Sequence, residues 1–295
     1  LQTIWHESGK KNYENIWFMG IRISNRTYYG QKEVKKEYYD SGKLKTETHY
    51  KNGKKEGLET WWYESGGKSS ETHYKNGVRE GLETSWYKSG KKFTESHFKN
   101  GIKEGLDIIW HESGKKYIET HFKNGKLEGL FTTWYETGET YYEVYYKNGK
   151  QEGLEITWYP SGKKKGLDHY NNGQREGLTI YWHESGEKQA KLYFKNGVQK
   201  GPYTTWYENG QKESEVYYKH GKPEGIRTFW YESGEKSLEH FFENGKRIRR
   251  IEYRENGKKK LEKHYKDGKE NGLWTEWDEV GKKFYQENFV DGNEE

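Results

Sequence analysis

Polar and apolar residues alternate along short stretches of the chain. From Leu82 to Trp86 every second residue falls on one face of an extended strand, and the residues between them, with Tyr87, fall on the other. The same two-residue period runs from Ile118 to Phe122. Helical spacing is not sustained anywhere, and glycines every ten to thirteen residues would break helices. The pattern predicts β-strands.

Glycines and tryptophans recur with a period of 24 residues. A second glycine series, from Gly53 to Gly245, mostly follows Asn, and a third, from Gly42 to Gly234, mostly follows Ser. Asn-Gly between alternating segments predicts a type I′ hairpin turn, because both central residues need positive φ. The first series is Gly57, Gly81, Gly105, Gly129, Gly153, Gly177, Gly201 and Gly225, and five positions after these stand Trp62, Trp86, Trp110, Trp134, Trp158, Trp182, Trp206 and Trp230.

The repeating unit is predicted to be a β-hairpin. One hairpin cannot bury its apolar side, so neighbouring hairpins must stack. Turns from Gly9 to Gly281 indicate about twelve units, which at about 4.8 Å per strand predict a sheet roughly 110 Å long. The expected fold class is all-β: an elongated, twisted, antiparallel single-layer sheet, or solenoid, of 24-residue repeats. We expect one continuous domain over residues 1–295, with atypical N-terminal repeats (1–41), regular repeats (42–245) and atypical basic C-terminal repeats (246–295).

Three stretches depart from the pattern. Met19-Gly20, after Trp17-Phe18, occupies the place of an Asn-Gly turn, and the region from Gly20 to Tyr39 is irregular. The unit from Pro160 to Asp168 carries Leu167 in place of Glu, which predicts a kink or bulge. Past Gly245 the tryptophan is interpreted as replaced by Arg254.

The pattern G-L-x-x-x-W-Y-x-S-G-K…E-x-x-Y-K-N-G-K resembles the bacterial variant of the MORN (membrane occupation and recognition nexus) repeat, over nearly the whole chain. The resemblance implies an elongated, twisted β-structure built from hairpins. It also implies roles in protein scaffolding, sometimes phospholipid contact, and in bacteria antitoxin- or immunity-like functions. The family has no catalytic residues to carry over.

Composition changes this picture in two ways. Hydrophobic residues make up 29% of the chain, aromatic residues 17%, and mean hydropathy is −1.39. Because each buried aromatic ring removes about 150–250 Å² from water, a thin aromatic core is expected instead of disorder. The chain has no cysteine, which excludes disulfides, zinc–thiolate sites and a cysteine nucleophile. No membrane span or signal peptide is visible, and the start at Leu1 without Met suggests trimming or export, so localisation is left open.

Histidines and glutamates recur at fixed positions of the repeat. They could be interpreted as catalytic or metal-binding residues, but the spacing argues against both interpretations. Adjacent copies in the column that contains His49 and His169 would lie about 10 Å apart, too far to close a zinc shell. For the column from Glu47 to Glu239, pairing with lysine across strands explains the residues better than glycoside chemistry. We therefore expect no enzyme activity, no metal and no cofactor.

Recognition is assigned to exposed rows instead. The Trp column is predicted to be core, with a sugar-stacking platform as the alternative. Tyrosines on the opposite face suit an interface because they offer area and a hydroxyl at low entropic cost, although a strand-forming role explains them equally well. The candidate partner-binding face comprises Tyr63, Tyr87, Tyr135, Tyr159, Tyr207, Tyr231, His73, His97 and His121.

Net charge is +5, and it is concentrated between Gly245 and Glu270. This segment is a candidate site for an anionic partner, with a solvated, charge-protected sheet end as the plainer explanation. The candidate anionic-partner patch comprises Lys246, Arg247, Arg249, Arg250, Arg254, Lys258, Lys259 and Lys260.

The sequence thus predicts a non-enzymatic scaffold that binds another macromolecule, most plausibly a protein, with an antitoxin or immunity role as one version. The alternatives are association with anionic lipid through the basic segment, and carbohydrate binding on aromatic rows. No recognised nucleic-acid-binding module is present. A homodimer is a further hypothesis, because a single-layer sheet leaves its Trp side open unless it coils tightly.

Overall fold

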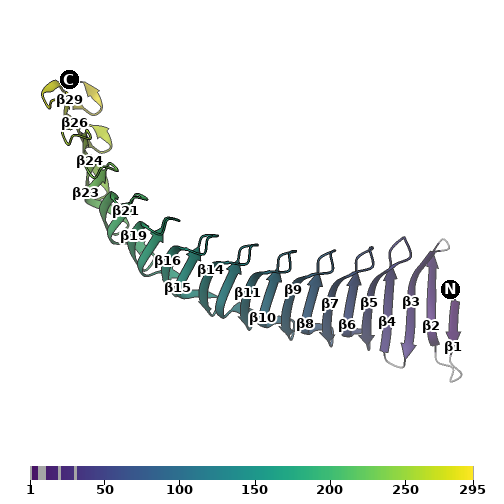
Figure 1. The fold of residues 1–295 in the computed structure, drawn as a ribbon. Coiled ribbons are helices and arrows are strands. Elements are labelled where there is room, and N and C mark those ends of the chain that lie inside the picture. Colours follow the sequence, from purple (N-terminus) through teal and green to yellow (C-terminus); the bar gives the residue numbers. More distant parts are fainter. Residues whose placement is uncertain (1, 6–10, 19–20, 30–31, 295) are drawn as a thin grey trace. The chain divides into compact units, whose positions relative to one another are not determined.

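The computed structural model describes residues 2–5, 11–18, 21–29 and 32–294, with side chains for residues 32–293. The chain divides into two compact units, Leu1–Lys150 and Gln151–Glu295. All regular structure in the described residues is β, which confirms the fold class. Within each unit successive strands lie side by side in one layer (Figure 1). The predicted single domain with its three parts stays a prediction.

Consecutive strands pair antiparallel within each unit. Some outgoing strands are broken near the Asn-Gly turn and appear as two short pieces, such as β12 and β13. The strands of the first unit are β1 (Gln2–Trp5), β2 (Lys11–Phe18), β3 (Ile21–Tyr29), β4 (Lys32–Tyr38), β5 (Leu44–Lys51), β6 (Lys54–Trp62), β7 (Lys68–Lys75), β8 (Val78–Trp86), β9 (Lys92–Lys99), β10 (Ile102–Trp110), β11 (Lys116–Lys123), β12 (Lys126–Leu127), β13 (Gly129–Trp134) and β14 (Thr140–Lys147). Those of the second unit are β15 (Lys150–Trp158), β16 (Lys164–Asn171), β17 (Gln174–Arg175), β18 (Gly177–Trp182), β19 (Lys188–Lys195), β20 (Val198–Gln199), β21 (Gly201–Trp206), β22 (Lys212–Lys219), β23 (Lys222–Trp230), β24 (Lys236–Glu243), β25 (Lys246–Tyr253), β26 (Lys259–Lys266), β27 (Lys269–Glu270), β28 (Gly272–Trp277), β29 (Lys283–Val290) and β30 (Asn293–Glu294).

The Asn-Gly dipeptides form the predicted turns. Asn76 and Gly77 have φ of 52° and 85°, both positive as a type I′ turn requires, and the other Asn-Gly turns repeat this. The opposite hairpin end is closed at the Ser-Gly sequences, where the Tyr63 carbonyl accepts a hydrogen bond from the Gly66 N–H at 2.8 Å. Each strand thus ends in a turn that its own sequence specifies, Asn-Gly at one end and Ser-Gly at the other.

The glycine of each Glu-Gly-Leu sequence lies in a bulge and not in a turn. On β8, Arg79 pairs with Tyr74 and Glu83 pairs with Thr72, so three residues face one residue of β7. Gly81, in the middle of the three, has φ of 91°. Glycine inside a strand pattern commonly marks such a bulge, because only glycine takes this conformation at little cost.

The core is thin and largely polar. Among the residues with described side chains, the buried apolar ones are Phe98, Ile108, Val144, Ala190, Val216, Ile251 and Phe289. Most of the other buried positions are threonines that repeat along the sheet, such as Thr60, Thr84 and Thr132. The tryptophans of the repeat are half-buried, so the prediction that they form the core is wrong. Lysine side chains lie over several of these tryptophan rings, which explains why the rings are partly shielded from solvent.

The three irregular stretches have separate outcomes. Met19-Gly20 lies outside the described residues, as does the Gly9 turn. The unit at Leu167 has the same register shift, next to Trp158, that every neighbouring hairpin has, so no special kink marks it. The assignment of Arg254 was wrong. Tyr253 pairs with Lys259 as each tryptophan pairs with its lysine, and Arg254 takes the following tyrosine position.

Candidate protein-binding surface

The tyrosines that follow each tryptophan join successive hairpins at the Ser-Gly edge. The Tyr87 hydroxyl donates to the Trp110 carbonyl at 2.7 Å, and the equivalent tyrosines of other repeats make the same bond to a carbonyl 22 or 23 residues later. Members of this set are Tyr39 to Trp62, Tyr63 to Trp86, Tyr159 to Trp182, Tyr207 to Trp230, and Tyr231 to Tyr253. Burial raises the pKa of Tyr87, Tyr159 and Tyr207.

Other residue types fill the same place where tyrosine is absent. His183 Nε2 bonds the Trp206 carbonyl at 2.8 Å, and Arg254 Nη2 donates to the Trp277 carbonyl at 2.9 Å. Tyr135 packs on Tyr141, with ring centroids 5.0 Å apart. These half-buried side chains lie along the hairpin edge and do not point outward as predicted. Their partner-binding role stays a prediction, and five of the six predicted tyrosines use their hydroxyl between repeats.

Lysine, tryptophan and glutamate form a repeated cluster on the Trp side. Lys92 Nζ lies 5.5 Å from the Trp110 ring centroid and 2.5 Å from Glu95 Oε2. A cation over an indole is worth about 0.5–1 kcal/mol at an exposed site. Glu95 therefore pairs with lysine, but within one strand, so the predicted cross-strand pairing is wrong at this position. The same pairing occurs at Glu71, Glu119, Glu215 and Glu239, whereas Glu47 pairs across strands with Lys36.

The histidine column supports the bulges. His73 Nδ1 donates to the Leu82 carbonyl at 2.9 Å, a carbonyl that the bulge removes from the regular ladder. His97 bonds the Leu106 carbonyl in the same way at 3.2 Å. His73, His97 and His121 are all exposed. In the part of the chain that the structure describes, no three His, Cys, Asp or Glu side chains are grouped to hold a metal ion.

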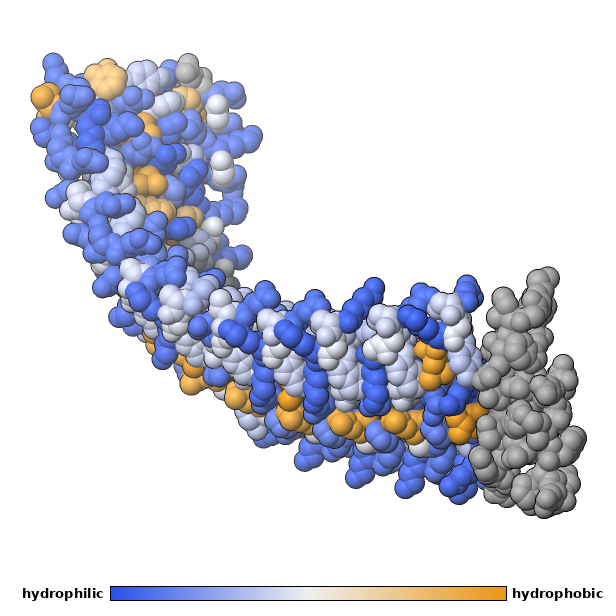
Figure 2. Space-filling model, turned by 45° about the vertical axis from the view of Figure 1, so that its right-hand side comes forward, coloured by the Kyte–Doolittle hydropathy of each residue, from blue (hydrophilic) through white to orange (hydrophobic). Residues whose placement is uncertain are grey.

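A row of half-buried to exposed side chains runs beside the bulges, and we call it the Leu–His stripe. In the first unit its members face one another in cross-strand pairs, Leu58 with His73, Leu82 with His97, Leu106 with His121, and Leu130 with Tyr145. Leu130 and Tyr145 are 49% and 45% exposed. On the face of the first unit seen in Figure 2, a row of hydrophobic residues runs between hydrophilic rows. Such ordered apolar exposure is typical of interaction surfaces.

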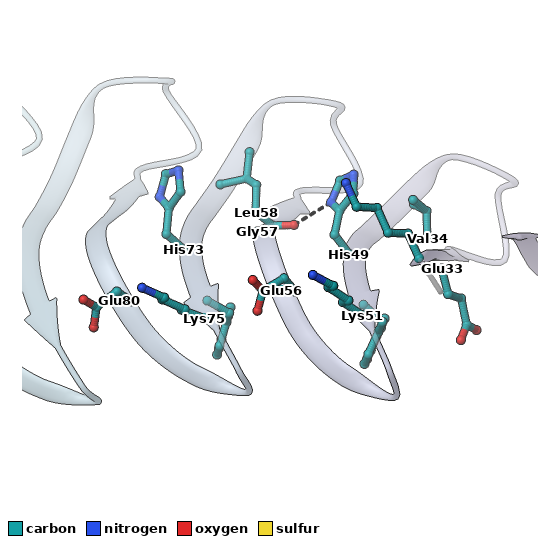
Figure 3. A pocket seen from close by; sticks show the side chains of 13 residues that line it. Glu33, Val34, His49, Lys51, Glu56, Gly57, Leu58, His73, Lys75 and Glu80 are labelled. Atoms are coloured by element: carbon teal, nitrogen blue, oxygen red, sulfur yellow. Dashed lines mark hydrogen bonds between the residues drawn. The ribbon is translucent and has the colours of Figure 1, made fainter. Parts of the chain in front are cut away.

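A hollow of about 730 Å³ adjoins the stripe in the first unit (Figure 3). His49, Leu58 and His73 lie on one side of it, and Glu56 and Lys75 lie toward the Asn-Gly turns. Its charges are mixed, since Glu56 and Glu80 alternate with Lys51 and Lys75 along the hairpins.

Those glutamates have a structural task. Glu56 Oε2 accepts a hydrogen bond from the backbone N–H of Asn76 at 2.7 Å, which ties one Asn-Gly turn to the next. The same turn also donates from the Gly77 N–H to the Lys55 carbonyl at 2.8 Å. The carboxylate bond recurs from Glu80 to Asn100, Glu104 to Asn124, Glu128 to Asn148, Glu152 to Asn172, Glu176 to Asn196, and Glu224 to Asn244.

The basic C-terminal segment is engaged within the protein. Every member of the predicted anionic-partner patch has an intramolecular contact, and five of the eight pair with a carboxylate. Lys246 pairs with Asp267, Arg247 lies over Tyr265, Arg249 over Phe241, Arg250 pairs with Glu252, Lys259 with Glu262 and Lys260 with Glu252, while Arg254 and Lys258 donate to the Trp277 and Val280 carbonyls. Its use by an anionic partner stays a prediction.

One cross-strand row that leads into this segment places three cationic side chains around a histidine. Arg227, His240, Arg250 and Lys263 lie directly opposite one another across β23 to β26. Burial, and then the charges of Arg247, Arg250 and Arg227, lower the pKa of His240 to about 4. His240 is therefore neutral at pH 7.

The described part of the chain contains no helix with the length and apolar character needed to cross a bilayer.

Comparison with known proteins identifies the repeat. No curated protein matches the sequence. Two solved structures resemble parts of the fold. "Crystal Structure of TcdB2-TccC3-Cdc42" has 11% identity and a TM-score of 0.20 over 94% of this chain, and "Structure of Photorhabdus luminescens Tc holotoxin pore, Mutation TccC3-D651A" has 9% identity and a TM-score of 0.21 over 99%. This chain spans only 18% and 16% of those chains, and the likeness carries no argument about function.

The family match is direct. The family described as MORN repeat variant matches just over half of the chain, at residues 34–52, 55–76, 79–100, 127–148, 151–172, 175–196 and 199–220. The unmatched stretch between 100 and 127 still forms the hairpin strands β10 and β11 in the common register. The chain therefore belongs to the MORN repeat variant family, a family of repeat scaffolds.

Proposed function

We propose that the protein is a non-enzymatic scaffold that binds a protein partner along the Leu–His stripe. The observation that carries this proposal is the direct pairing of half-buried leucines with exposed histidines at one position of successive repeats, followed by the exposed pair of Leu130 and Tyr145. Weak apolar contacts repeated at fixed spacing add their free energies once the first contact is made. Imidazole and phenol rings beside them supply polar groups of the kind that enrich interfaces.

The test removes apolar character from the stripe without touching its hydrogen bonds. The triple variant Leu82→Lys, Leu106→Lys, Leu130→Lys keeps every backbone carbonyl that the histidines bond. Val280→Lys is the matched control, because Val280 is 73% exposed and lies outside the stripe. Affinity purification from the native cell with in-cell cross-linking is expected to map a specific protein to the stripe with the wild type and the control, and not with the triple variant. Equal capture by all three would contradict the proposal.

An antitoxin or immunity role is the narrower version of this function. It predicts that the partner is a toxic protein and that co-expression rescues growth. Growth that is equally poor with the wild type and with the triple variant would reject this version and leave the scaffold proposal standing.

Lipid association remains a separate prediction of the sequence. The intramolecular contacts of the basic segment give it no added support. Sedimentation with anionic liposomes at low salt tests it directly, and absence of binding would remove it.

A further inference from the structure

The ladder of glutamate-capped turns in the second unit is broken at Lys200. Lys200 stands where the other Glu-Gly-Leu sequences have glutamate, and His220 stands where the next turn has Asn. His220 keeps the turn geometry, with φ of 52°, and the Gly221 N–H still donates to the Gln199 carbonyl at 3.1 Å. The turn is therefore intact, but the residue that would cap the His220 N–H carries an ammonium group instead of a carboxylate.

A groove lies at this break. One hollow of about 890 Å³ is lined by Lys195, Lys200, Lys219 and His220, and a second of about 440 Å³ shares Lys195 and Lys200 with it. We call the two together the Lys200 groove. Within residues 32–293 none of these three lysines makes an ion pair. Glu176, on the rim of the smaller hollow, already accepts from the Asn196 N–H.

The groove matches the first-unit hollow of Figure 3, six repeats earlier, position by position. Lys51 and Lys75 correspond to Lys195 and Lys219, whereas Glu56 corresponds to Lys200. The histidines His49 and His73 correspond to Tyr193 and Tyr217, and Leu58 corresponds to Pro202. One location in the repeat thus has balanced charge in the first unit and concentrated positive charge in the second.

Apolar surface lies beside this charge. Tyr217 is 50% exposed and Val198 is 46% exposed, and both line the larger hollow. A rim of lysines around exposed aromatic and aliphatic side chains matches an acidic side chain that has an apolar neighbour.

We propose that the Lys200 groove binds an acidic segment of a protein partner. An Asp or Glu carboxylate of that segment takes the place of the missing glutamate, accepts from the His220 N–H and pairs with Lys200, with Lys195 and Lys219 beside it. Hydrogen bonds between ionised groups are about twice as strong as neutral ones, and a carboxylate can accept several at once. An apolar side chain next to it packs on Tyr217 and Val198. The inference rests on the proposed protein-binding function and adds the chemistry of the partner.

The experiment uses a labelled extended peptide of alternating Glu and Leu, its Gln counterpart, and the full-length protein. Fluorescence anisotropy is expected to show binding of the Glu peptide that weakens with salt, and at least tenfold weaker binding of the Gln peptide. Lys200→Glu should weaken the affinity for the Glu peptide at least tenfold. Lys99→Glu, which makes the same change of charge in a repeat that keeps its Glu104 cap, should alter binding less than twofold.

The repeat pattern also provides a check that the Lys200→Glu variant folds. Lys200→Glu restores the glutamate of the repeat, so its Tm should equal or exceed that of the wild type. The proposal would be overturned if Lys200→Glu left the affinity for the Glu peptide unchanged. It would also be overturned if Lys99→Glu reduced that affinity as much as Lys200→Glu does. Inorganic phosphate that binds in a Lys200-dependent way while the peptide does not would also overturn it, since the site would then be a simple anion site.

The groove and the stripe can fail separately. A native partner captured equally by the wild type and by Lys200→Glu, but lost with the stripe variant, would reject the groove and keep the proposed function. Peptide binding that depends on Lys200, together with native capture that ignores the stripe, would keep the groove and reject the stripe.

Discussion

The Tyr87 hydroxyl joins two hairpins through one hydrogen bond to the Trp110 carbonyl. Its neighbours in the sequence do not reveal this, because alternation assigns a side chain to a face and says nothing of what lies 23 residues later. Tyr87 also lies at the point where the strand ends, so the two-residue period no longer fixes its direction. The outward orientation was predicted wrongly for this reason.

Removing this hydroxyl should weaken the fold measurably. Tyr87→Phe keeps the ring and loses the bond to a part-buried carbonyl, so the free energy of unfolding should fall by about 0.5–1.5 kcal/mol. Tyr145→Phe is the matched control, because Tyr145 is 45% exposed in the stripe. Urea denaturation measures both, and equal losses would show that the Tyr87 hydroxyl has no special part.

His240 should make stability depend on pH. Its folded pKa of about 4 lies below the ordinary value of about 6.5, so the unfolded state binds a proton first as pH falls. The stabilising contribution is complete above pH 6.5 and is lost as pH falls toward 4. Denaturant titrations between these values should show a smaller pH dependence for His240→Phe than for the wild type. His73→Gln is the control at an exposed site, and its stability should depend on pH as strongly as that of the wild type. An imidazole NMR signal of His240 that titrates near 6.5 would contradict the argument.

At the scale of the hairpin, most of the architecture can be predicted. Alternation gives the strands, and Asn-Gly gives the turns, because both are local properties of the backbone. The bulge was missed, although the glycine within each Glu-Gly-Leu sequence was its visible signal. The candidate site was predicted only in part. The histidine column was found, whereas the groove depends on knowing that the glutamates cap the turns, a role that appears only when hairpins are stacked.

The bulge glycine is open to a direct test. Gly81→Ala places a Cβ on a residue with φ of 91°, which should cost about 1–2 kcal/mol of unfolding free energy. Gly67→Ala is the control, because Gly67 has no positive φ and open space around its Cβ position, so no loss is expected there. Thermal unfolding compares the two, and a Gly81→Ala protein as stable as the control would show that the bulge does not need glycine.

At the scale of the molecule, the repeats behave as nearly interchangeable parts. From Tyr39 to Asn148, successive hairpins contact one another through equivalent bonds, at the tyrosine (a histidine at His111), the glutamate and the Asn-Gly turn. Stability should then be close to a sum of nearest-neighbour contributions. For the proposed binding function, we expect specificity to come from positions that break the rule, such as Lys200.

Deletion of one whole repeat tests this additivity. Removing residues 81–104 joins Glu80 to Gly105 and recreates the Glu-Gly-Leu sequence, so a folded protein with a smaller denaturant m-value is expected. Removing only residues 81–92 deletes one strand with Trp86 and Tyr87, and should disrupt the stack. Circular dichroism with urea titration distinguishes them, and equal damage from both deletions would contradict the repeat-by-repeat account.

The bonds between hairpins all run in one direction along the chain. The side chains of Glu56 and Tyr63 bond backbone groups of Asn76 and Trp86, which come later in the chain. Each new hairpin therefore supplies the backbone partners for side chains of the hairpin before it. During synthesis from the N-terminus at roughly 5–20 residues per second, each 24-residue hairpin follows the one before it by about one to five seconds, so its docking groups are already made when it leaves the ribosome. Growth of the sheet can therefore keep pace with translation, without waiting for distant parts of the sequence.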